Sequence, residues 1–270
     1  MINRNENRLG RFTSSEIYKL CGIGKRKMTD EEKKEHKKNN PSSRAQTIQD
    51  ESLFLEAGYT YITQKKQERK RKRSLDMNGS SSSTDWGDLM ERRVFELIGL
   101  EYIDTAKKTY IHPLFPKYWA GSPDLFIPSV KTGDIKGYEP INFCKYADCL
   151  LQKDLDLLKS EFPKEYWQIV SNACIMGVSK GEIILYQPYD SEAKAIKELI
   201  EEIQDSLIVP NWNYQRIADN IDVGEIYNPF QPDDSDYPNL ITWEFDIPEE
   251  DKEFITNRVE QAIKLLDETD

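Results

Sequence analysis

Apolar residues recur at intervals of three or four in some stretches of the chain and alternate with polar residues in others. The first pattern is typical of helices that bury one face, and it occurs in residues 84–98, 163–176, 191–207 and from 248 or 249 onward. The second pattern predicts strands at residues 109–112, 119–127, 133–138, 182–186 and 240–246. This succession predicts an α/β fold in which helices flank a central mixed sheet.

The first eighty or so residues show a weaker pattern. A short helix is expected where Thr13 or Ser14 can act as its cap, with glycines beyond Leu20 to end it. Residues 25–46 are nearly all polar and predict a mobile insertion. A second helix is expected over residues 48–62.

A strongly basic run follows that helix. It contains seven basic residues and one acid. The basic residues are Lys65, Lys66, Arg69, Lys70, Arg71, Lys72 and Arg73. Such a run suits contact with nucleic-acid phosphates, and the alternative is a solvated charged surface, because basic clusters alone are poorly specific.

Length and composition favour one intracellular domain with extensions. A chain of 270 residues can bury one substantial core, and its four cysteines lack a zinc-binding pattern, which favours reduced thiols. No apolar run approaches the roughly 18 residues of a membrane span, and the polar N-terminus does not resemble a signal peptide. We therefore expect a soluble cytoplasmic protein without a membrane partner.

The net charge of −11 is unevenly distributed. Residues 182–270 hold 6 basic and 23 acidic groups, whereas residues 1–181 hold 31 basic and 25 acidic groups. Attraction to phosphate is screened beyond roughly 10 Å in 0.1 M salt, so a basic face can bind DNA on a protein that is acidic overall. We expect a main domain over residues 1–190, with a basic insertion at about 25–83. An acidic extension over residues 191–270, helical in part and irregular over about 210–238, is expected to pack on or beside that domain.

Three acids and one lysine offer the chemistry of a metal-dependent nuclease. Asp134 and Lys136 share one face of a predicted strand, because side chains alternate along it. Asp124 precedes Asp134 by ten residues, after a break at Pro123, and Glu91 lies on a predicted helix. Carboxylates bind Mg²⁺ or Mn²⁺, and the lysine can orient or help to deprotonate the attacking water. The set indicates phosphodiester hydrolysis.

Each of these elements also has an explanation without function. Ser-Pro-Asp is an ordinary turn, Asp-Ile-Lys is an ordinary exposed strand, and a helical glutamate followed by two arginines is often a surface ion-pair partner. Lys136 could simply pair with Asp134 or Glu91. Their occurrence together, in this order and spacing, favours a shared site.

The same residues resemble a known family. Glu91, Asp124 and Asp134 with Lys136 are similar to the helix acid and the divided acidic signature of PD-(D/E)XK nucleases. The chain specifically resembles the phage lambda exonuclease and YqaJ-like viral recombinase group. That resemblance rests on residues 8–15, 86–91, 121–124 and 166–168, and it covers about residues 8–24 and 84–188. It implies a restriction-endonuclease-like core, although Asp134 stands where this group usually has glutamate.

The resemblance implies an activity and further site residues. The activity is 5′ to 3′ exonuclease action on one strand of linear double-stranded DNA, with two Mg²⁺ or Mn²⁺ ions, which leaves a 3′ single strand for phage-type recombination. Residues matching Arg8, Ser15 and Ser122 would hold the 5′-terminal phosphate. The carbonyl of Ile135 would be a further metal ligand, and Gln168 would join the catalytic residues.

The resemblance also implies partners and a source. A ring-like homotrimer, a single-strand annealing recombinase as partner, and a phage or prophage gene expressed in a bacterial host are expected. Two other functions remain open at this stage. One is an endonuclease of restriction or repair type with the same metal site, and the other is a non-catalytic relative that binds DNA or a protein partner. For Gln168, an amide on a helix surface is the alternative.

Overall fold

The structure is a computed structural model, and it describes residues 7–75, 82–100, 108–208, 210–224 and 230–268. Its central sheet has four strands in the order β6, β7, β8, β9. Their bounds are Leu125–Ile127, Lys131–Lys136, Lys180–Tyr186 and Leu240–Asp246. The β7–β8 pair is parallel, and the two outer pairs are antiparallel. The predicted α/β fold with a central mixed sheet is therefore confirmed.

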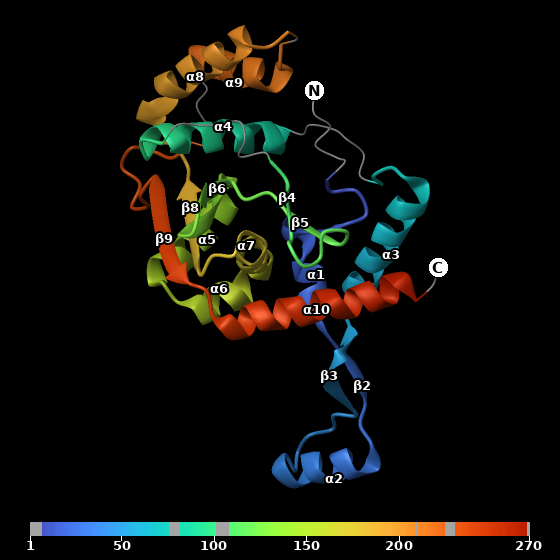
Figure 1. Ribbon diagram of the computed structural model, residues 1–270. Coiled ribbons are helices and arrows are strands. Elements are labelled where there is room, and N and C mark those ends of the chain that lie inside the picture. Colours follow the sequence, from blue (N-terminus) through green and yellow to red (C-terminus); the bar gives the residue numbers. More distant parts are fainter. Residues whose placement is uncertain (1–6, 76–81, 101–107, 209, 225–229, 269–270) are drawn as a thin grey trace.

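Alternating side chains of the sheet fill two cores on its two faces. On β8, Ile183 and Leu185 belong to one buried cluster, whereas Ile184 and Tyr186 belong to the other. Helices α4, α8 and α9 cover the second face, and α5, α6, α7 and α10 pack against the first, as Figure 1 shows. Their bounds are Ser82–Leu97, Ala193–Asp205, Trp212–Asp222, Pro140–Gln152, Leu155–Glu161, Pro163–Met176 and Glu249–Asp267.

A second, smaller sheet brings the N-terminal segment beside the central one. Its strands have the order β1, β5, β4, with bounds Phe12–Thr13, Trp119–Gly121 and Tyr110–Ile111. The predicted N-terminal helix is a 3₁₀ turn, η1 (Ser14–Glu16), followed by α1 (Tyr18–Cys21). A further 3₁₀ turn, η3 (Asp190–Glu192), precedes α8. The predicted strand over residues 119–127 is broken into β5 and β6 by the segment that holds Pro123, as expected.

The insertion is structured, which corrects two sequence predictions. Instead of a mobile segment and a helix over residues 48–62, the chain forms an antiparallel ribbon of β2 and β3 that carries α2, and then α3. The bounds are Ile23–Lys27, Thr47–Phe54, Asp30–Asn39 and Glu56–Arg71. The ribbon projects from the body in Figure 1. Because both faces of such a ribbon are exposed, its strands can be polar and give no alternating pattern.

The acidic C-terminal part contributes to both cores. β9 is a strand of the central sheet, and α10 buries Ile255, Val259 and Leu266 in the core that α7 lines. The segment that begins at Trp212 was predicted to be irregular but forms α9, whose N-terminus is capped by the Asn211 side chain. The acidity of this region therefore lies mainly on outward faces. No helix in the described ranges is long and apolar enough to span a membrane.

Arg258 of α10 fixes the base of the projecting ribbon. Its guanidinium is 1% exposed and donates to the carbonyl oxygens of Leu20 (2.7 Å), Gly22 (2.9 Å), Leu53 (3.0 Å) and Glu51. We expect Arg258→Met to lower the free energy of unfolding by about 3 kcal/mol or more, because it leaves buried carbonyls without donors. Chemical denaturation measures this. Arg44→Met, at an exposed position on the ribbon, should change it by under about 0.5 kcal/mol.

Candidate active site

The register of the central sheet places Asp124 opposite Asp134. β6 and β7 pair Leu125 with Gly133, and continuing this antiparallel register by one residue brings the two aspartates together. The Ile135 N–H donates to Asp124 Oδ2 at 2.8 Å. Because Pro123 lies between β5 and β6, its missing N–H removes no hydrogen bond from either ladder. The break in the strand thus aims Asp124 at β7.

Asp134, Lys136 and Gln168 form one hydrogen-bonded group. Asp134 is 1% exposed, and its two oxygens lie 2.6 Å from Gln168 Nε2 and 2.5 Å from Lys136 Nζ. Lys136 Nζ also donates to Gln168 Oε1 at 3.4 Å. The alternation along β7 therefore places acid and lysine on one face, as predicted, and α7 brings the Gln168 amide to both.

Glu91 approaches the same group from α4. Its helix buries Leu89, Met90 and Val94 against the sheet, and Glu91 itself is 9% exposed. Burial raises the pKa of Asp124 well above its ordinary value, and the negative charges of Asp134 and Glu91 raise it further. The structure therefore brings all three predicted acids within electrostatic reach of one another.

One lysine only partly compensates these acids. Burial disfavours the charge on Lys136, but Asp134 and Asp124 outweigh burial, and the pKa of Lys136 is raised above its usual range. Three carboxylates and one ammonium leave an excess of negative charge in a largely buried place, which a divalent cation with hard oxygen ligands would balance. The kinds of donors present therefore fit Mg²⁺ or Mn²⁺.

These carboxylates do not yet form a closed cage. In the part of the chain that the structure describes, no group of three or more His, Cys, Asp or Glu side chains is arranged to hold a metal ion. The reason lies in the contacts above: oxygens of Asp124 and Asp134 face the Ile135 N–H, the Gln168 amide and the Lys136 ammonium. The donors are present, and their oxygens are directed at protein groups.

Two of the three residues predicted for the terminal phosphate contact each other, and the third lies on an adjacent segment. Arg8 Nη2 donates to Ser15 Oγ at 3.3 Å, and Arg8 Nε is buried without a hydrogen-bond partner among the described atoms. β1 pairs in parallel with β5, Thr13 opposite Ala120, and a Cβ on Gly121 would lie 2.3 Å from Ser14 Oγ, so the segments that continue to Ser15 and Ser122 lie side by side. Ser122 Oγ is 3.0 Å from Thr109 Oγ1. Ser122 precedes Asp124 by two residues, so the pocket adjoins the acids.

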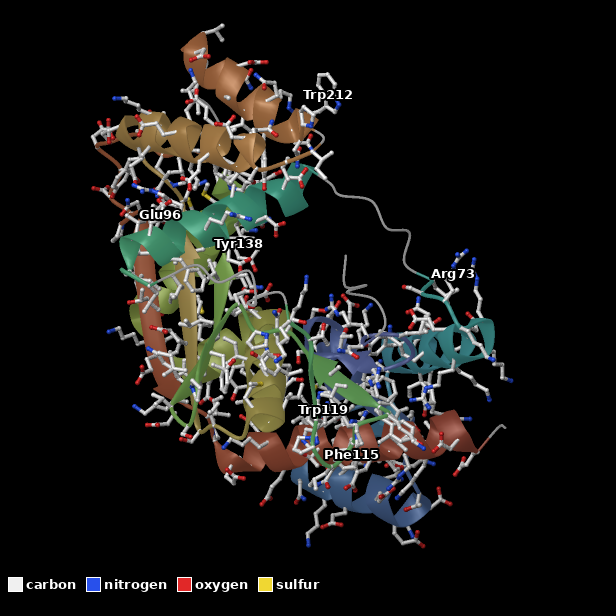
Figure 2. All side chains as sticks on the ribbon, turned by 45° about the horizontal axis from the view of Figure 1, so that its top comes forward. Arg73, Glu96, Phe115, Trp119, Tyr138 and Trp212 are labelled. Carbon is white, nitrogen blue, oxygen red and sulfur yellow. The ribbon has the colours of Figure 1, made fainter. Side chains whose placement is uncertain are left out.

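The basic run has two kinds of residue. Lys65 is 7% exposed and pairs with buried Glu68 at 3.0 Å, and Arg69 donates to the Gly10 and Lys117 carbonyls at 2.8 and 2.9 Å. Arg69 and Glu68, which accepts from the Gly10 N–H at 3.0 Å, hold α3 against the body, and Lys66 is half-buried. The outward-facing members are Lys70, Arg71, Lys72 and Arg73. Figure 2 shows Arg73 at the end of α3, away from the central sheet.

Two polar residues of α7 on either side of Gln168, Glu165 and Asn172, were not predicted. Glu165, Gln168 and Asn172 recur at helical spacing on a helix that is otherwise largely apolar. Glu165 accepts a hydrogen bond from the Tyr138 hydroxyl at 2.6 Å. Asn172 is 1% exposed, and a Cβ on Gly121 would lie 2.3 Å from its Oδ1. The polar stripe within an apolar helix was the available signal in the sequence.

Comparison with known proteins gives structural similarity alone. No protein-family model and no curated protein sequence matches the chain. An alkaline exonuclease (LHK-Exo) from Laribacter hongkongensis is 12% identical over 97% of this chain and 90% of its own, with a TM-score of 0.53. LHK-Exo in complex with dAMP gives a TM-score of 0.52 at 12% identity, over 97% of this chain and 90% of that one.

A second protein gives the same result. A phage-related exonuclease from Haemophilus somnus 129PT is 13% identical over 96% of this chain and 94% of its own, with a TM-score of 0.52. The chain thus has the fold of these exonucleases along nearly its whole length. The resemblance stated from the sequence is confirmed at the level of the fold.

Proposed function

We propose that this protein is a Mg²⁺-dependent 5′ to 3′ exonuclease that degrades one strand of linear double-stranded DNA and leaves a 3′ single strand for homologous recombination. The observation that carries the proposal is the group formed by Asp124, Asp134 and Lys136, with Glu91 in electrostatic reach. The exonuclease fold supports it, as does a neighbouring structure solved in complex with dAMP, a nucleotide.

The chain's own residues have distinct parts in the proposed reaction. Glu91, Asp124, Asp134 and the Ile135 carbonyl would hold the metal, expected as two ions. The metal supplies charge neutralisation at the phosphate and a water of lowered pKa. Lys136 orients that water and stabilises negative charge that develops on the phosphate oxygens. Gln168 fixes Asp134 and Lys136 relative to each other through its two hydrogen bonds.

Recognition of a 5′-terminal phosphate is proposed for Arg8, Ser15 and Ser122. A buried guanidinium nitrogen without a partner among the described atoms, in a side chain that contacts the Ser15 hydroxyl, is suited to a terminal phosphate, which carries more charge than an internal one. This pocket favours an exonuclease over an endonuclease, because only a chain end offers such a group. Intact acids and lysine favour an enzyme over a non-catalytic binder.

We expect Arg8→Ala to remove the preference for phosphorylated 5′ ends. Loss of a charge-assisted contact of this kind should lower kcat/KM by about 10- to 100-fold on 5′-phosphorylated duplex and leave the rate on 5′-hydroxyl duplex nearly unchanged. Steady-state digestion of the two duplexes measures it. Arg44→Ala, at an exposed position on the ribbon, is the matched control. Equal losses on both duplexes would contradict the pocket.

Direction of digestion can be read from labelled ends. A duplex labelled at one 5′ terminus should release its label as mononucleotide from the first time points, whereas a 3′-labelled strand should shorten gradually. Early release of the 3′ label instead would contradict the proposed polarity.

Light scattering on the same protein tests the homotrimer, and co-purification with a single-strand annealing recombinase tests that proposed partner.

A further inference from the structure

An exposed tryptophan stands at the start of α9. Trp212 is 79% exposed, whereas the four other tryptophans of the chain, Trp86, Trp119, Trp167 and Trp243, are between 0% and 8% exposed. The most exposed large apolar neighbour is Ile208, at 97%. A tryptophan left in water forgoes the stabilisation that burial of its large surface would give. Its exposure here therefore requires an explanation outside the core.

The backbone around Trp212 is firmly held. Asn211 Oδ1 accepts from the N–H groups of Asn213 at 2.9 Å and Tyr214 at 3.4 Å. Gln204 of α8 donates to the Asn211 carbonyl at 3.0 Å and accepts from the Asn211 N–H at 2.8 Å. A ring presented from such a capped and anchored turn loses little conformational freedom when a ligand stacks on it.

The residue after Trp212 joins α9 to α4, the helix that carries Glu91. Asn213 Nδ2 donates to Asp85 Oδ2 in the first turn of α4 at 2.6 Å, and Tyr214, 5% exposed, packs in the core beneath α4. Asp85 precedes Glu91 by six residues, which is about 9 Å along a helix axis. Successive stacked nucleotides of one strand are about 3.4 Å apart. A strand running along α4 from Glu91 would reach the level of Asp85, whose partner Asn213 follows Trp212, within about three nucleotides.

The surrounding charges select the kind of ligand. The outward face of α8 is acidic on balance and repels DNA phosphates: Lys194 and Lys197 pair with Glu198 and Glu201, and Glu202 and Asp205 are exposed as well. Trp212 itself is uncharged, and Arg216, also exposed, shares its face of α9 one turn later. A duplex encloses its base faces and presents only phosphates on its outside. A single strand can turn a base toward the indole while its backbone stays away from α8.

The geometry points to a nucleic-acid contact. We propose that Trp212 is a stacking platform for an unpaired nucleobase of the DNA strand that passes Glu91. This rests on the proposed nuclease function. Figure 2 shows Trp212 at the edge of the α8–α9 pair that faces α3 and Arg73. Aromatic stacking on single strands is sequence-tolerant, as an exonuclease that degrades DNA of any sequence requires.

The chain offers a direct spectroscopic test. Because Trp212 is the exposed member of the five tryptophans, accessible tryptophan fluorescence reports on it selectively. We expect a short oligothymidylate, added to the full-length protein in EDTA, to quench this emission in the wild type. Trp212→Phe should bind the oligomer and show no quenching. Trp212→Ala should bind it about 5- to 100-fold more weakly by fluorescence anisotropy, which is the usual effect of losing one stacked base.

Ile208→Ala is the matched control, since it alters an exposed apolar side chain near Trp212 without removing an aromatic ring. It should bind the oligomer as the wild type does. Bound oligomer without quenching, or unchanged affinity of Trp212→Ala, would overturn the proposal. Equal losses in Ile208→Ala and Trp212→Ala would do so as well, and would indicate an apolar surface for a protein partner. If any of these results is found and the wild type still cuts linear duplex, the stacking proposal fails and the proposed nuclease function stands. If the wild type neither binds nor cuts any DNA, the stacking proposal and the proposed function both fail.

Discussion

Replacing Asp124 by asparagine is expected to abolish DNA cleavage and to stabilise the metal-free protein. Asparagine keeps an oxygen that can accept from the Ile135 N–H, now 2.8 Å from Asp124 Oδ2, but it removes one charge from the three acids. Loss of a metal-binding carboxylate should lower the rate at least about 1000-fold, or about 4 kcal/mol on the barrier. Digestion of linear duplex measures the first effect.

The stabilisation follows from the raised pKa of Asp124, which burial causes first and Asp134 and Glu91 increase. An acid whose pKa is higher in the folded than in the unfolded state loses folding free energy as pH rises from its ordinary pKa through the raised one. Because asparagine does not ionise, the variant does not lose this folding free energy as pH rises. Its melting temperature in EDTA should therefore exceed that of the wild type. Each kcal/mol of stabilisation raises the melting temperature by about 2 to 4 °C, and the difference grows with pH over this interval.

Two further measurements separate this result from a general effect of charge. Mg²⁺ should raise the melting temperature of the wild type and have little effect on Asp124→Asn, because binding to the folded state alone stabilises it. Asp205→Asn, at an exposed position on α8, should change neither activity nor stability. A destabilised Asp124→Asn that still responds to Mg²⁺ would exclude Asp124 from the metal site.

Lys136→Met should give the second large effect, a loss of at least about 100-fold in kcat with DNA affinity retained. Its ammonium lies 2.5 Å from Asp134 and 3.4 Å from the Gln168 carbonyl oxygen, where it can act on charge that develops during cleavage. Removal of one preorganised donor typically costs a factor of 10² to 10³. Single-turnover digestion together with an anisotropy measurement in EDTA separates the two quantities.

The same strand supplies the control. Lys131 of β7 pairs with Glu182 and Glu244, both at 2.9 Å, on another part of the sheet. Lys131→Met should therefore leave kcat unchanged. Lys136→Met should also lower the melting temperature in EDTA, because it leaves Asp134 without its cationic partner, and Mg²⁺ should restore part of that loss. Equal kcat values for the two variants would remove Lys136 from the reaction.

The sequence predicted those parts of the fold whose pattern is set by a two-sided core. α7 and β9 begin and end where the predicted helix and strand did, because each buries a regular set of apolar residues. The ribbon of β2 and β3 could not be predicted in this way, since it packs no core of its own. The sequence did not predict α9, because Pro210 and the asparagines around Trp212 are typical of irregular segments. In the structure, Asn211 caps the N-terminus of this helix.

The candidate site was predicted more fully than the fold around it. Alternation placed Asp134 and Lys136 on one face, and a register of two antiparallel strands placed Asp124 opposite. The approach of the Ser15 and Ser122 segments depends on the parallel pairing of β1 with β5, about one hundred residues apart in the chain, for which the family resemblance was the available guide. The sequence did not show which members of the basic run face outward. Only the structure shows that Lys65 is buried beside Glu68 and that Arg69 donates to the carbonyls of Gly10 and Lys117.

The most direct measurement of the proposed activity compares two forms of one DNA. Purified protein with Mg²⁺ is incubated with a covalently closed circular duplex and with the same duplex made linear and 5′-phosphorylated, with Asp124→Asn and EDTA as controls. Progressive loss of one strand of the linear form, no change in the circle, and no reaction in either control is the predicted result. Cutting of the circle, or digestion that persists in Asp124→Asn, would contradict an end-dependent nuclease built on these acids.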